Sequence, residues 1–435
     1  MTFLHITLAV LALLSGALAF WQWLAARRFP LHRRAADTSF TPAVTLLKPL
    51  KGCDETTAAS LASWFHQDYA GPVQILFGVA DPADPVCPIV NDLIAQNPKC
   101  HARLVICGKM AGANAKVAKL AELAELAEHD LVLVSDADVR IPPDFLANIV
   151  APMHADGRAG GPLPGGGGAS VPASRLVSSL APPKGGAPET AYRAKVGLVC
   201  CFYRLANPTT TAMRWEAIAI NADFWSQVLQ AAGLKSLDFA LGAVMLTRRK
   251  LLDEIGGFKA LADCLADDYQ LGHRIARRGH RIALCPVVVE CWDAPATWRG
   301  VWQHQLRWAR TIRVCQPTPY FFSILSNATL WPILWLAVEL KKTSVTFFRG
   351  PDSLAGGIGL PCGIIIAVAL LLIRIAMAQN LQRRFTPNRI LVSPFWLVPV
   401  KDLFQALIWF CAFTGNTVEW RGRRMKLKRD GTLVE

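Results

Sequence analysis

The chain has 435 residues, of which 52% are hydrophobic and only 18% are charged, whereas about 25% of the residues in a typical soluble domain are charged. Its 46 Lys and Arg residues outnumber its 32 Asp and Glu residues, which gives a formal net charge of +14. This composition excludes a disordered protein and a small disulfide scaffold, and it disfavours an ordinary soluble enzyme. We expect a membrane protein with a globular part, whose basic residues face anionic lipid or an anionic substrate. The 12 cysteines form no CxxC pair, which predicts reduced, mostly buried thiols.

The N-terminal segment is an apolar run over residues 3–24, in which His5 is the titratable side chain. About 20 apolar residues span a bilayer. Four arginines follow the run, at Arg27, Arg28, Arg33 and Arg34. A cleaved signal peptide has its basic cluster before the apolar run, so we expect residues 1–34 to form an uncleaved transmembrane anchor. The chain that follows is expected on the cytoplasmic side.

Residues 40–315 alternate short apolar strands with helical stretches and are expected to form a cytosolic domain. We expect strands at residues 43–47, 73–80, 103–106, 131–135, 196–203, 243–246 and 281–289, and helices near 55–66, 87–96, 115–128, 266–278 and 298–311. This alternation predicts βαβ units, an α/β fold with a mostly parallel sheet, and a ligand site beyond the carboxyl ends of the strands. Gly and Pro make up 15 of the 32 residues 157–188, which predicts a flexible insertion within the domain.

Residues 318–415 form a C-terminal membrane region with apolar runs at 320–340, 354–373 and 390–415. The third run contains Lys401 and Asp402, a pair that is costly in lipid. We therefore expect this run to be re-entrant, interfacial or turned toward other helices. A fourth full span would export the basic tail, residues 416–435, against the positive-inside rule. The sequence thus predicts three spans, one hydrophobic segment that does not cross, and a basic cytosolic tail.

Acidic residues follow two of the expected strands. Asp81 and Asp84 come after strand 73–80, and Asp136 and Asp138 come after strand 131–135. An Asp-x-Asp motif at a strand end lets two carboxylates converge on one cation, and oxygen ligands suit Mg²⁺ or Mn²⁺. Such a cation could bridge a diphosphate and neutralise a departing nucleotide. The alternative is that Asp136 or Asp138 caps the following helix.

Two further groups of residues have both a structural and a functional interpretation. Asp267 and Asp268 open a helix, where acids are favoured by the helix dipole. One of them could instead accept a proton from an attacking hydroxyl. In the segment His304-Gln305-Leu306-Arg307-Trp308, the last two side chains could hold a diphosphate and a base or sugar face. Arg and Trp are equally typical of a membrane interface.

The order of these features resembles that of processive and lipid-directed glycosyltransferases of family 2. The resemblance is closer to the ceramide glucosyltransferase branch, family 21, and extends to bacterial hopanoid glycosyltransferases. Residues 46–52 look like the opening strand and loop of that branch. The chain has four more segments that resemble segments of that branch: Gly108-Lys109, Gly112-x-Asn114-x-Lys116, Gly256-Gly257-Phe258 and Ala266-Asp267-Asp268-Tyr269. The match covers roughly residues 1–340 apart from the insertion, and its motifs occur together in order.

The resemblance implies a GT-A (Rossmann-like) fold that binds a UDP-sugar and inverts its anomeric centre. Asp268 matches the general base, and Asp267 occupies the more variable place before it. Asp136 and Asp138 match the site of a metal–diphosphate complex with Mg²⁺ or Mn²⁺. The other residues expected to bind the donor are Lys48, Asp81, Asp84, Asn114, Lys116, His304, Arg307 and Trp308. His304 departs from the family because it stands at a Gln or Arg position, although it can still donate a hydrogen bond to a phosphate.

A cytosolic active site flanked by membrane segments predicts a membrane lipid acceptor and a place in the lipid bilayer, here a bacterial inner membrane. Two acceptors fit: a ceramide that receives glucose, or a hopanoid polyol that receives N-acetylglucosamine. The segment 214–233 is expected to be either an amphipathic helix beside the lipid access route or a core-facing helix.

Function classes other than glycosyl transfer are disfavoured. A transporter component is disfavoured because the chain has few clean spans and no inverted hydropathy repeat. A non-catalytic scaffold is disfavoured because Asp84, Asp136 and Asp268 are all present. Nucleic acid is not expected as a partner, because the basic residues cluster beside membrane segments.

Overall fold

The computed structural model describes residues 2–108, 112–155, 194–347, 362–386, 392–420, 423–428 and 430–434. Lys109 and the predicted insertion 157–188 lie outside the described residues. The chain divides into two compact units. The first, called the sheet unit below, comprises Pro30–Tyr203 and Ala231–Ala294. The second, called the helical unit, comprises Met1–Phe29, Arg204–Gln230 and Pro295–Glu435, so it includes parts of the predicted domain 40–315.

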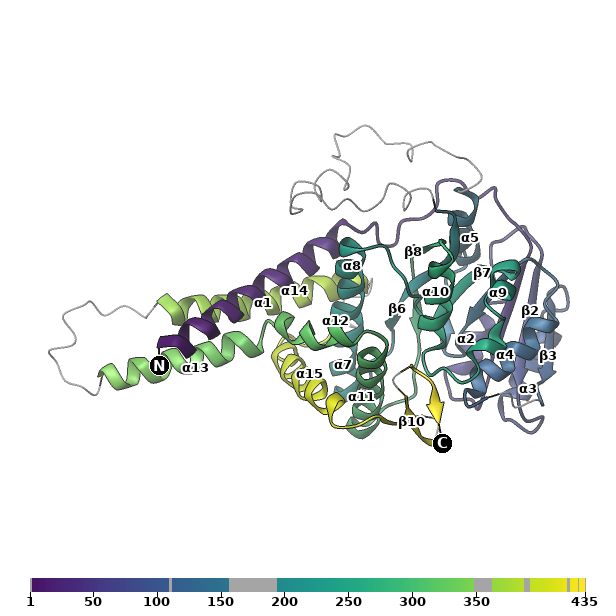
Figure 1. Ribbon diagram of the computed structural model, residues 1–435. Helices are drawn as coiled ribbons and strands as arrows, with labels where there is room; N and C mark the ends of the chain where they lie inside the picture. Colours follow the sequence, from purple (N-terminus) through teal and green to yellow (C-terminus); the bar gives the residue numbers. More distant parts are fainter. Residues whose placement is uncertain are drawn as a thin grey trace. The chain divides into compact units, whose positions relative to one another are not determined.

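The sheet unit contains an eight-stranded sheet in the order β3-β2-β1-β4-β7-β6-β8-β5 (Figure 1). Its strands are β1 Val44–Pro49, β2 Val73–Val79, β3 His101–Ile106, β4 Leu131–Ser135, β5 Val139–Arg140, β6 Val196–Leu205, β7 Val244–Arg248 and β8 Arg281–Cys291. The α/β fold class expected from the sequence is confirmed, and each expected strand is present within a few residues.

The sheet is mixed, so the expectation of a mostly parallel sheet is wrong for one half of it. Strands β3, β2, β1 and β4 are parallel neighbours. In contrast, β7 is antiparallel to both β4 and β6, and β5 is antiparallel to β8. Helical crossovers join β1 through β4, as parallel pairing requires. The connection from β6 to β7 instead leads from the end of β6 to a start of β7 at the same edge of the sheet. The two strands are therefore antiparallel.

The helices of the sheet unit are α2 Thr57–Ala62, α3 Val86–Gln96, α4 Ala115–Glu125, α5 Phe145–Ala155, α9 Arg249–Glu254 and α10 Asp267–Arg277, with a 3-10 turn at Phe258–Leu261. Four of them, α2, α3, α4 and α10, overlap the expected helices, whereas α5 and α9 are not among the expected ones. All twelve cysteines of the chain are free, and seven of them are buried, in agreement with the expected reduced thiols.

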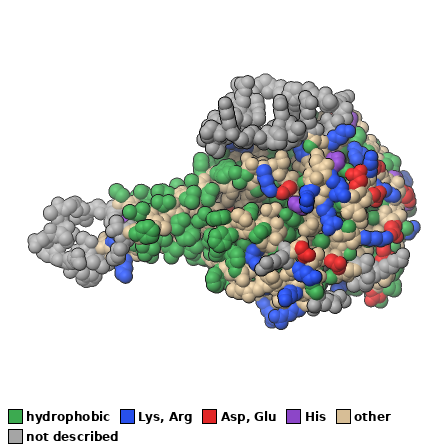
Figure 2. All heavy atoms as spheres, viewed as in Figure 1, with side chains coloured by type: hydrophobic (Ala, Val, Ile, Leu, Met, Phe, Trp, Pro, Cys, Tyr) green, Lys and Arg blue, Asp and Glu red, His purple; other side chains and the backbone are tan. Residues whose placement is uncertain are grey.

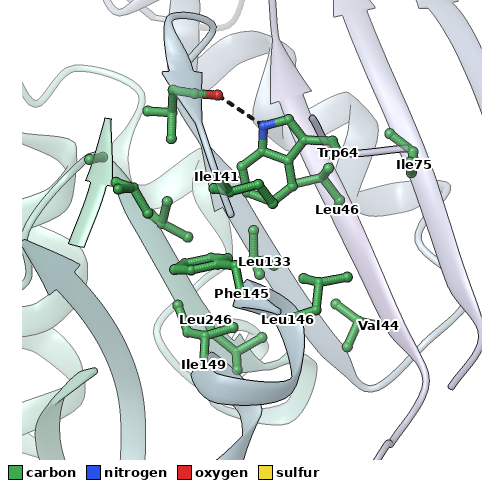
Figure 3. Packing of buried hydrophobic residues seen from close by; sticks show 14 of the residues in the cluster. Val44, Leu46, Trp64, Ile75, Leu133, Ile141, Phe145, Leu146, Ile149 and Leu246 are labelled. Carbon is green, nitrogen blue, oxygen red and sulfur yellow. Dashed lines mark hydrogen bonds between the residues drawn. The ribbon is translucent and has the colours of Figure 1, made fainter. Parts of the chain in front are cut away.

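The core of the sheet unit is packed around Trp64, which follows α2 (Figure 3). Its indole ring packs edge-on against Phe145 at a centroid distance of 6.1 Å. The indole Nε1–H donates to the backbone carbonyl of Val139 at 3.0 Å, so this buried polar group is paired, as buried tryptophans require. Leu46 and Leu133 from the central strands are buried in the same cluster. Trp64 thereby packs in one cluster with side chains of β1 and β4 and is hydrogen-bonded to β5.

The helical unit consists of long apolar helices, shorter polar helices and a small C-terminal sheet. Its elements are α1 Thr2–Arg28, α7 Thr211–Ile218, a π-helix Ala219–Phe224, α8 Trp225–Leu234, α11 Trp298–Cys315, α12 Pro317–Phe322, α13 Leu330–Phe347, α14 Cys362–Phe385, α15 Leu397–Phe413, β9 Thr417–Trp420, β10 Arg423–Leu427 and β11 Leu433–Val434. Of the two interpretations of segment 214–233, the core-facing one is right, because Trp215 and Trp225 are both buried.

Two helices in the described part of the chain are long and apolar enough to cross a membrane, Phe3–Arg28 and Cys362–Phe385. A third span is formed if the bent pair Pro317–Ser326 and Leu330–Thr343, which meet at 43°, acts as one. Figure 2 shows hydrophobic side chains gathered over α1, α13 and α14. By length and composition, Phe3–Arg28 fits the predicted anchor, and the bent pair overlaps the predicted run 320–340. The predicted run 354–373 begins outside the described residues, and its described part lies in the candidate span Cys362–Phe385.

Lys401 and Asp402, the charged pair expected to be costly in lipid, are buried within the helical unit. Arg374 of α14 donates to both oxygens of Asp402 and to Asp223 of the π-helix, and Lys401 also pairs with Asp223. Thr329 donates its hydroxyl to Asp402 at 2.5 Å. Two cations and two anions therefore neutralise one another, and the charged pair of this run is turned toward other helices.

Candidate active site

The candidate site lies at the edge of the sheet where β1, β2 and β4 end. These strands are parallel, so their carboxyl ends meet at one edge. Strand β7 is antiparallel to β4, with Val244 opposite Ser135, so β7 begins at this same edge. The amide of Asp136 donates to the carbonyl of Ala243 at 3.2 Å, which joins the end of β4 to the start of β7. This edge can therefore gather side chains from four strands.

Lys48 is a fully buried cation on β1. Its Nζ donates to the carbonyl of Asp136 at 2.7 Å and to the hydroxyl of Ser135 at 3.2 Å. The ammonium also lies 4.6 Å from the centre of the Trp64 ring. Burial lowers the pKa of Lys48 to about 7, although Asp138 and Asp136 oppose this shift. An anion at this edge would favour its charged form.

Lys116, in the first turn of α4, joins two of the predicted site carboxylates. Its Nζ lies 2.7 Å from Asp136 Oδ1 and 3.1 Å from Asp267 Oδ2. Burial alone would lower the pKa of Lys116, but Asp136 and Asp267 raise it above its usual value. Lys116 therefore places a positive charge between the end of β4 and the start of α10.

Asp268, the predicted base, is half-buried in the first turn of α10. Its Oδ1 accepts a hydrogen bond from the amide of Tyr269 at 2.7 Å. Burial and then the neighbouring charge of Asp267 raise the pKa of Asp268 to about 6, against the opposing effect of Lys116. A Cβ atom at Gly242 would lie 2.7 Å from Asp268 Oδ2, so this carboxylate needs a glycine beside it. A carboxylate with a pKa near neutrality is suited to proton transfer.

Asn114 forms the N-cap of α4 and is fully buried. Its Oδ1 accepts from the amides of Lys116 and Val117, and its Nδ2 donates to the carbonyl of Cys264 at 2.8 Å. These bonds tie the start of α4, and with it Lys116, to the turn before α10. The observed contacts of Asn114 thus position the neighbouring site residues, while its predicted role in donor binding stays a prediction.

Asp84 and Asp81 lie after β2, in the loop before α3. Both carboxylate oxygens of Asp84 accept from the amide of Gly52, at 2.9 and 3.0 Å. Gly52 has φ = 67°, a left-handed conformation that favours glycine. Asp84 therefore fixes the loop that follows β1. Asp81 is exposed and accepts from the amide of Ala83 at 2.8 Å.

Asp138, the second acid of the Asp-x-Asp motif, is half-buried beside β5. Burial and then the charges of Asp136 and Asp293 raise its pKa to about 7. In the described part of the chain, no group of three or more His, Cys, Asp or Glu side chains is placed to hold a metal ion. Two carboxylates are nevertheless the donor set with which Mg²⁺ is commonly held, together with substrate phosphates. The oxygen donors of Asp136 and Asp138 fit this chemistry.

His304, Arg307 and Trp308 belong to the helical unit, on α11. His304 Nδ1 lies 2.7 Å from Oε1 of Glu216, and Gln305 Nε2 donates to the same oxygen at 2.9 Å. The His304 ring packs edge-on against Trp308, with a centroid distance of 4.6 Å. The buried Glu216 carboxylate thus orients the side chain that departs from the family motif.

The predicted site residues therefore fall into two groups. Within the sheet unit, ion pairs and hydrogen bonds join Lys48, Lys116, Asp136 and Asp267, while Asp84 fixes the loop after β1. The helical unit carries His304, Arg307 and Trp308. Sequence reasoning missed three residues, Trp64 beneath Lys48, Gly242 beside Asp268 and Glu216 at His304. Their contacts are made across long stretches of sequence, and none of them stands in a recognisable local motif.

Comparison with known proteins supports the resemblance drawn from the sequence. The profile of glycosyl transferase family 21 matches residues 5–160 and 189–433. Ceramide glucosyltransferase 1 of Caenorhabditis elegans is 21% identical over 405 residues, which cover 93% of this chain and 76% of that protein. Ceramide glucosyltransferase of Candida albicans is 32% identical over 131 residues, which cover 28% of this chain and 24% of that protein.

The solved structures matched by the comparison include the mannosyltransferase PcManGT from Pyrobaculum calidifontis in complex with GDP-Man and Mn2+. The TM-score is 0.44 at 19% sequence identity, and the alignment covers 92% of this chain and 99% of that chain. The family profile matches far more than half of the residues. The chain belongs to glycosyl transferase family 21 and is a glycosyltransferase.

Proposed function

We propose that the protein transfers a hexose, with inversion, from a UDP-sugar to a hydroxyl group of a membrane lipid at the cytosolic leaflet. The observation that carries this proposal is the environment of Asp268. Its pKa is raised to about 6, and Gly242 leaves room for its carboxylate at the edge of the sheet. Inverting transfer needs one base near the acceptor hydroxyl and no covalent nucleophile on the enzyme.

In the proposed reaction, Asp268 accepts the proton of the acceptor hydroxyl while that oxygen forms a bond to the anomeric carbon. The bond between this carbon and the diphosphate oxygen breaks, and UDP leaves with the bonding electron pair. Asp267, in the same turn, raises the pKa of Asp268 and so makes it a stronger base. Lys116 limits this effect and keeps Asp268 ionised near neutral pH.

Negative charge that develops on the leaving UDP must be met by cations. Lys48 and Lys116 supply positive charge at the end of β1 and β4. Asp136 and Asp138 would hold Mg²⁺ or Mn²⁺, which would neutralise diphosphate charge when bound. Asp81, Asp84 and Asn114 complete the part of the proposed donor site that the sheet unit carries. His304, Arg307 and Trp308, on α11 of the helical unit, are proposed to bind the donor as well.

Glucose and ceramide are the proposed substrates of first choice, because the relatives named above are ceramide glucosyltransferases. The alternative pair is N-acetylglucosamine and a hopanoid polyol. In both cases the lipid would be presented by the bilayer that holds α1 and α14, proposed to be a bacterial inner membrane.

The deciding experiment incubates the purified full-length protein with UDP-glucose or UDP-N-acetylglucosamine and with ceramide or a hopanoid polyol. Mass spectrometry then identifies the lipid product. A glucosylceramide supports the first choice, and an N-acetylglucosaminyl hopanoid supports the alternative. Release of UDP without any glycolipid, in every combination, would contradict both ceramide and a hopanoid polyol as the acceptor.

A further inference from the structure

Helix α15 runs beside α11 along most of its length, within the helical unit. In the middle of α15, the Phe404 ring packs edge-on against Trp302 at a centroid distance of 5.3 Å. At its end, the guanidinium of Arg313 lies 5.7 Å from the centre of the Phe413 ring. Between these contacts, Ile408 and Ala412 are buried in one cluster with Val301 and Ala309 of α11. The two helices are therefore parallel partners.

The partner helix α11 is too polar for the hydrocarbon core of a membrane. Its sequence includes Arg299, Arg307, Arg310 and Arg313 in 18 residues. A charged side chain in the middle of the hydrocarbon costs several kcal/mol, or about 2.5–3.5 kcal/mol on insertion scales. Because α15 packs side by side with α11, α15 is also kept out of the middle of the hydrocarbon core, at the boundary between lipid and water.

The face of α15 that turns away from α11 is apolar and exposed. It consists of Val400, Leu403, Leu407 and Phe410, preceded by the exposed Trp396. These residues follow one another at intervals of three or four, which places them on one side of a helix. The charged residues of the helix, Lys401 and Asp402, are buried against Arg374 and Asp223 instead. The exposed side of α15 thus offers only apolar atoms.

Helix α12 extends this apolar face. Phe321 and Phe322 are both more than half exposed. Phe321 packs against Trp409 and Phe413 of α15, at centroid distances of 6.2 and 6.3 Å. A group of large exposed apolar side chains on two neighbouring helices is typical of an interaction surface.

The small sheet that begins four residues after α15 carries positive charge on one face of its central strand. Arg424, Lys426 and Lys428 are exposed, whereas the alternating Met425 and Leu427 are buried. Alternate residues of a strand point to opposite faces, so Arg424 and Lys426 share one face, and Lys428 follows directly after the strand. The sheet is fastened to α11, because Gln303 donates to Glu419 at 2.9 Å and Arg310 donates to the carbonyl of Thr417.

We propose that α15 and α12 lie in the plane of the membrane surface, with their exposed apolar faces among the acyl chains, and that β10 binds anionic lipid headgroups. The occupant of this surface is the bilayer itself, because α12 leads into the apolar helix α13 and α15 lies in the same unit as the candidate spans α1 and α14. The bent pair of α12 and α13 is then a surface helix followed by an apolar helix, and a cationic face follows α15. The helical unit would then be anchored in the bilayer in two ways, by the candidate spans α1 and α14 and by the surface helices α12 and α15. This proposal is independent of the sugar and of the acceptor lipid.

The first test uses photo-leucine in place of leucine in the full chain, with irradiation in membranes and mass spectrometry of lipid adducts. Adducts are expected at Leu403 and Leu407. Leu372 on α14, which is 62% exposed, is the positive control, and the buried Leu397 at the start of α15 is the matched negative control. Adducts at Leu372 without any at Leu403 or Leu407 would overturn the proposal.

The second test compares hydrogen–deuterium exchange of residues 417–434 in phosphatidylcholine nanodiscs with and without phosphatidylglycerol. The anionic lipid is expected to slow exchange by roughly tenfold or more, and salt is expected to weaken the effect. R424E/K426E/K428E should lose this protection, while K99E/K250E/R277E, which changes three exposed cations of the sheet unit, should keep it. Equal loss in both variants, or protection that is the same in both lipids, would contradict the assignment of β10.

Discussion

The ammonium of Lys116 lies 2.7 Å from Asp136 Oδ1, and its other partner is Asp267, the residue before the proposed base. One buried cation therefore connects the acid at the end of β4 with the acids that open α10. This connection couples the proposed metal–diphosphate site at Asp136 to the proposed base, because the same positive charge acts on the pKa of Asp268.

The pH dependence of transfer follows from this coupling. Asp268 must be ionised to act as a base, so the rate is expected to rise with pH through about 6. Lys116 lowers the pKa of Asp268, and K116M should therefore move this limb of the pH–rate profile to higher pH. K250M removes an exposed cation and is the matched control. An unchanged limb in K116M would contradict the coupling.

The substitution D268N tests the base itself. We expect transfer to fall by about a hundredfold to ten-thousandfold, the range typical of general bases. UDP-sugar affinity, measured by calorimetry, should remain near that of the wild type. D253N, which changes an exposed carboxylate in α9, should be fully active. Near-normal transfer by D268N would remove Asp268 from the mechanism.

Gly242 gives a test that leaves the identity of every proposed catalytic side chain unchanged. The Cβ of an alanine would lie 2.7 Å from Asp268 Oδ2, so the carboxylate must move. We expect kcat of G242A to fall tenfold or more, because small displacements of a reacting group cost rate steeply. G233A is the matched control, since a Cβ at Gly233 meets no atom within 4 Å. Equal kcat in the two variants would show that the close approach has no effect on catalysis.

A chelator tests the proposed cation between the enzyme and the diphosphate. Activity should be lost in EDTA and restored by Mg²⁺ or Mn²⁺. In D136N/D138N, more metal should be needed for half-maximal rate, because two oxygen ligands have lost their charge. D253N should titrate with metal like the wild type. Full activity in chelator would contradict a metal role for Asp136 and Asp138.

Glu216 and His304 provide the fifth prediction. Glu216 accepts bonds from both His304 and Gln305, so E216Q should loosen the orientation of His304. If His304 contacts the donor, KM for the UDP-sugar should rise about tenfold, since hydrogen bonds to charged groups contribute about 1.5–3 kcal/mol. E254Q, in which the exposed Glu254 is changed, is the control. A lower kcat with an unchanged KM would contradict a role in donor binding.

The strands and helices around the site could be read from the sequence because βαβ periodicity is local. Leu131–Ser135 was expected as a strand at 131–135, and the helix that begins at Asp267 was expected from residue 266. The direction of β7 could not be predicted in this way. Whether a strand runs parallel to its neighbour depends on the end at which the chain returns, and hydrophobic alternation is the same for both directions.

The site acids could also be named from sequence, whereas their partners could not. Asp136 and Asp268 stand in short motifs after a strand and at a helix start. The pairing of His304 with Glu216 spans 88 residues, and the approach of Gly242 to Asp268 depends on how β7 begins. Such contacts result from tertiary packing, and they produce no periodic pattern in the sequence around either residue.

The path of the chain through its two units has a consequence for synthesis at the ribosome. Residues 204–230 belong with helices made much later, because the partners of Asp223 are Arg374, 151 residues on, and Lys401, 178 residues on. Until those residues emerge, the newly made segment carries an unpaired acid and the large apolar side chains of Trp215 and Trp225. A nascent chain stopped at residue 315 would therefore expose apolar side chains and an unpaired carboxylate. We expect chaperones or proteases to bind such a chain. The last helices of the protein complete the folding of its middle.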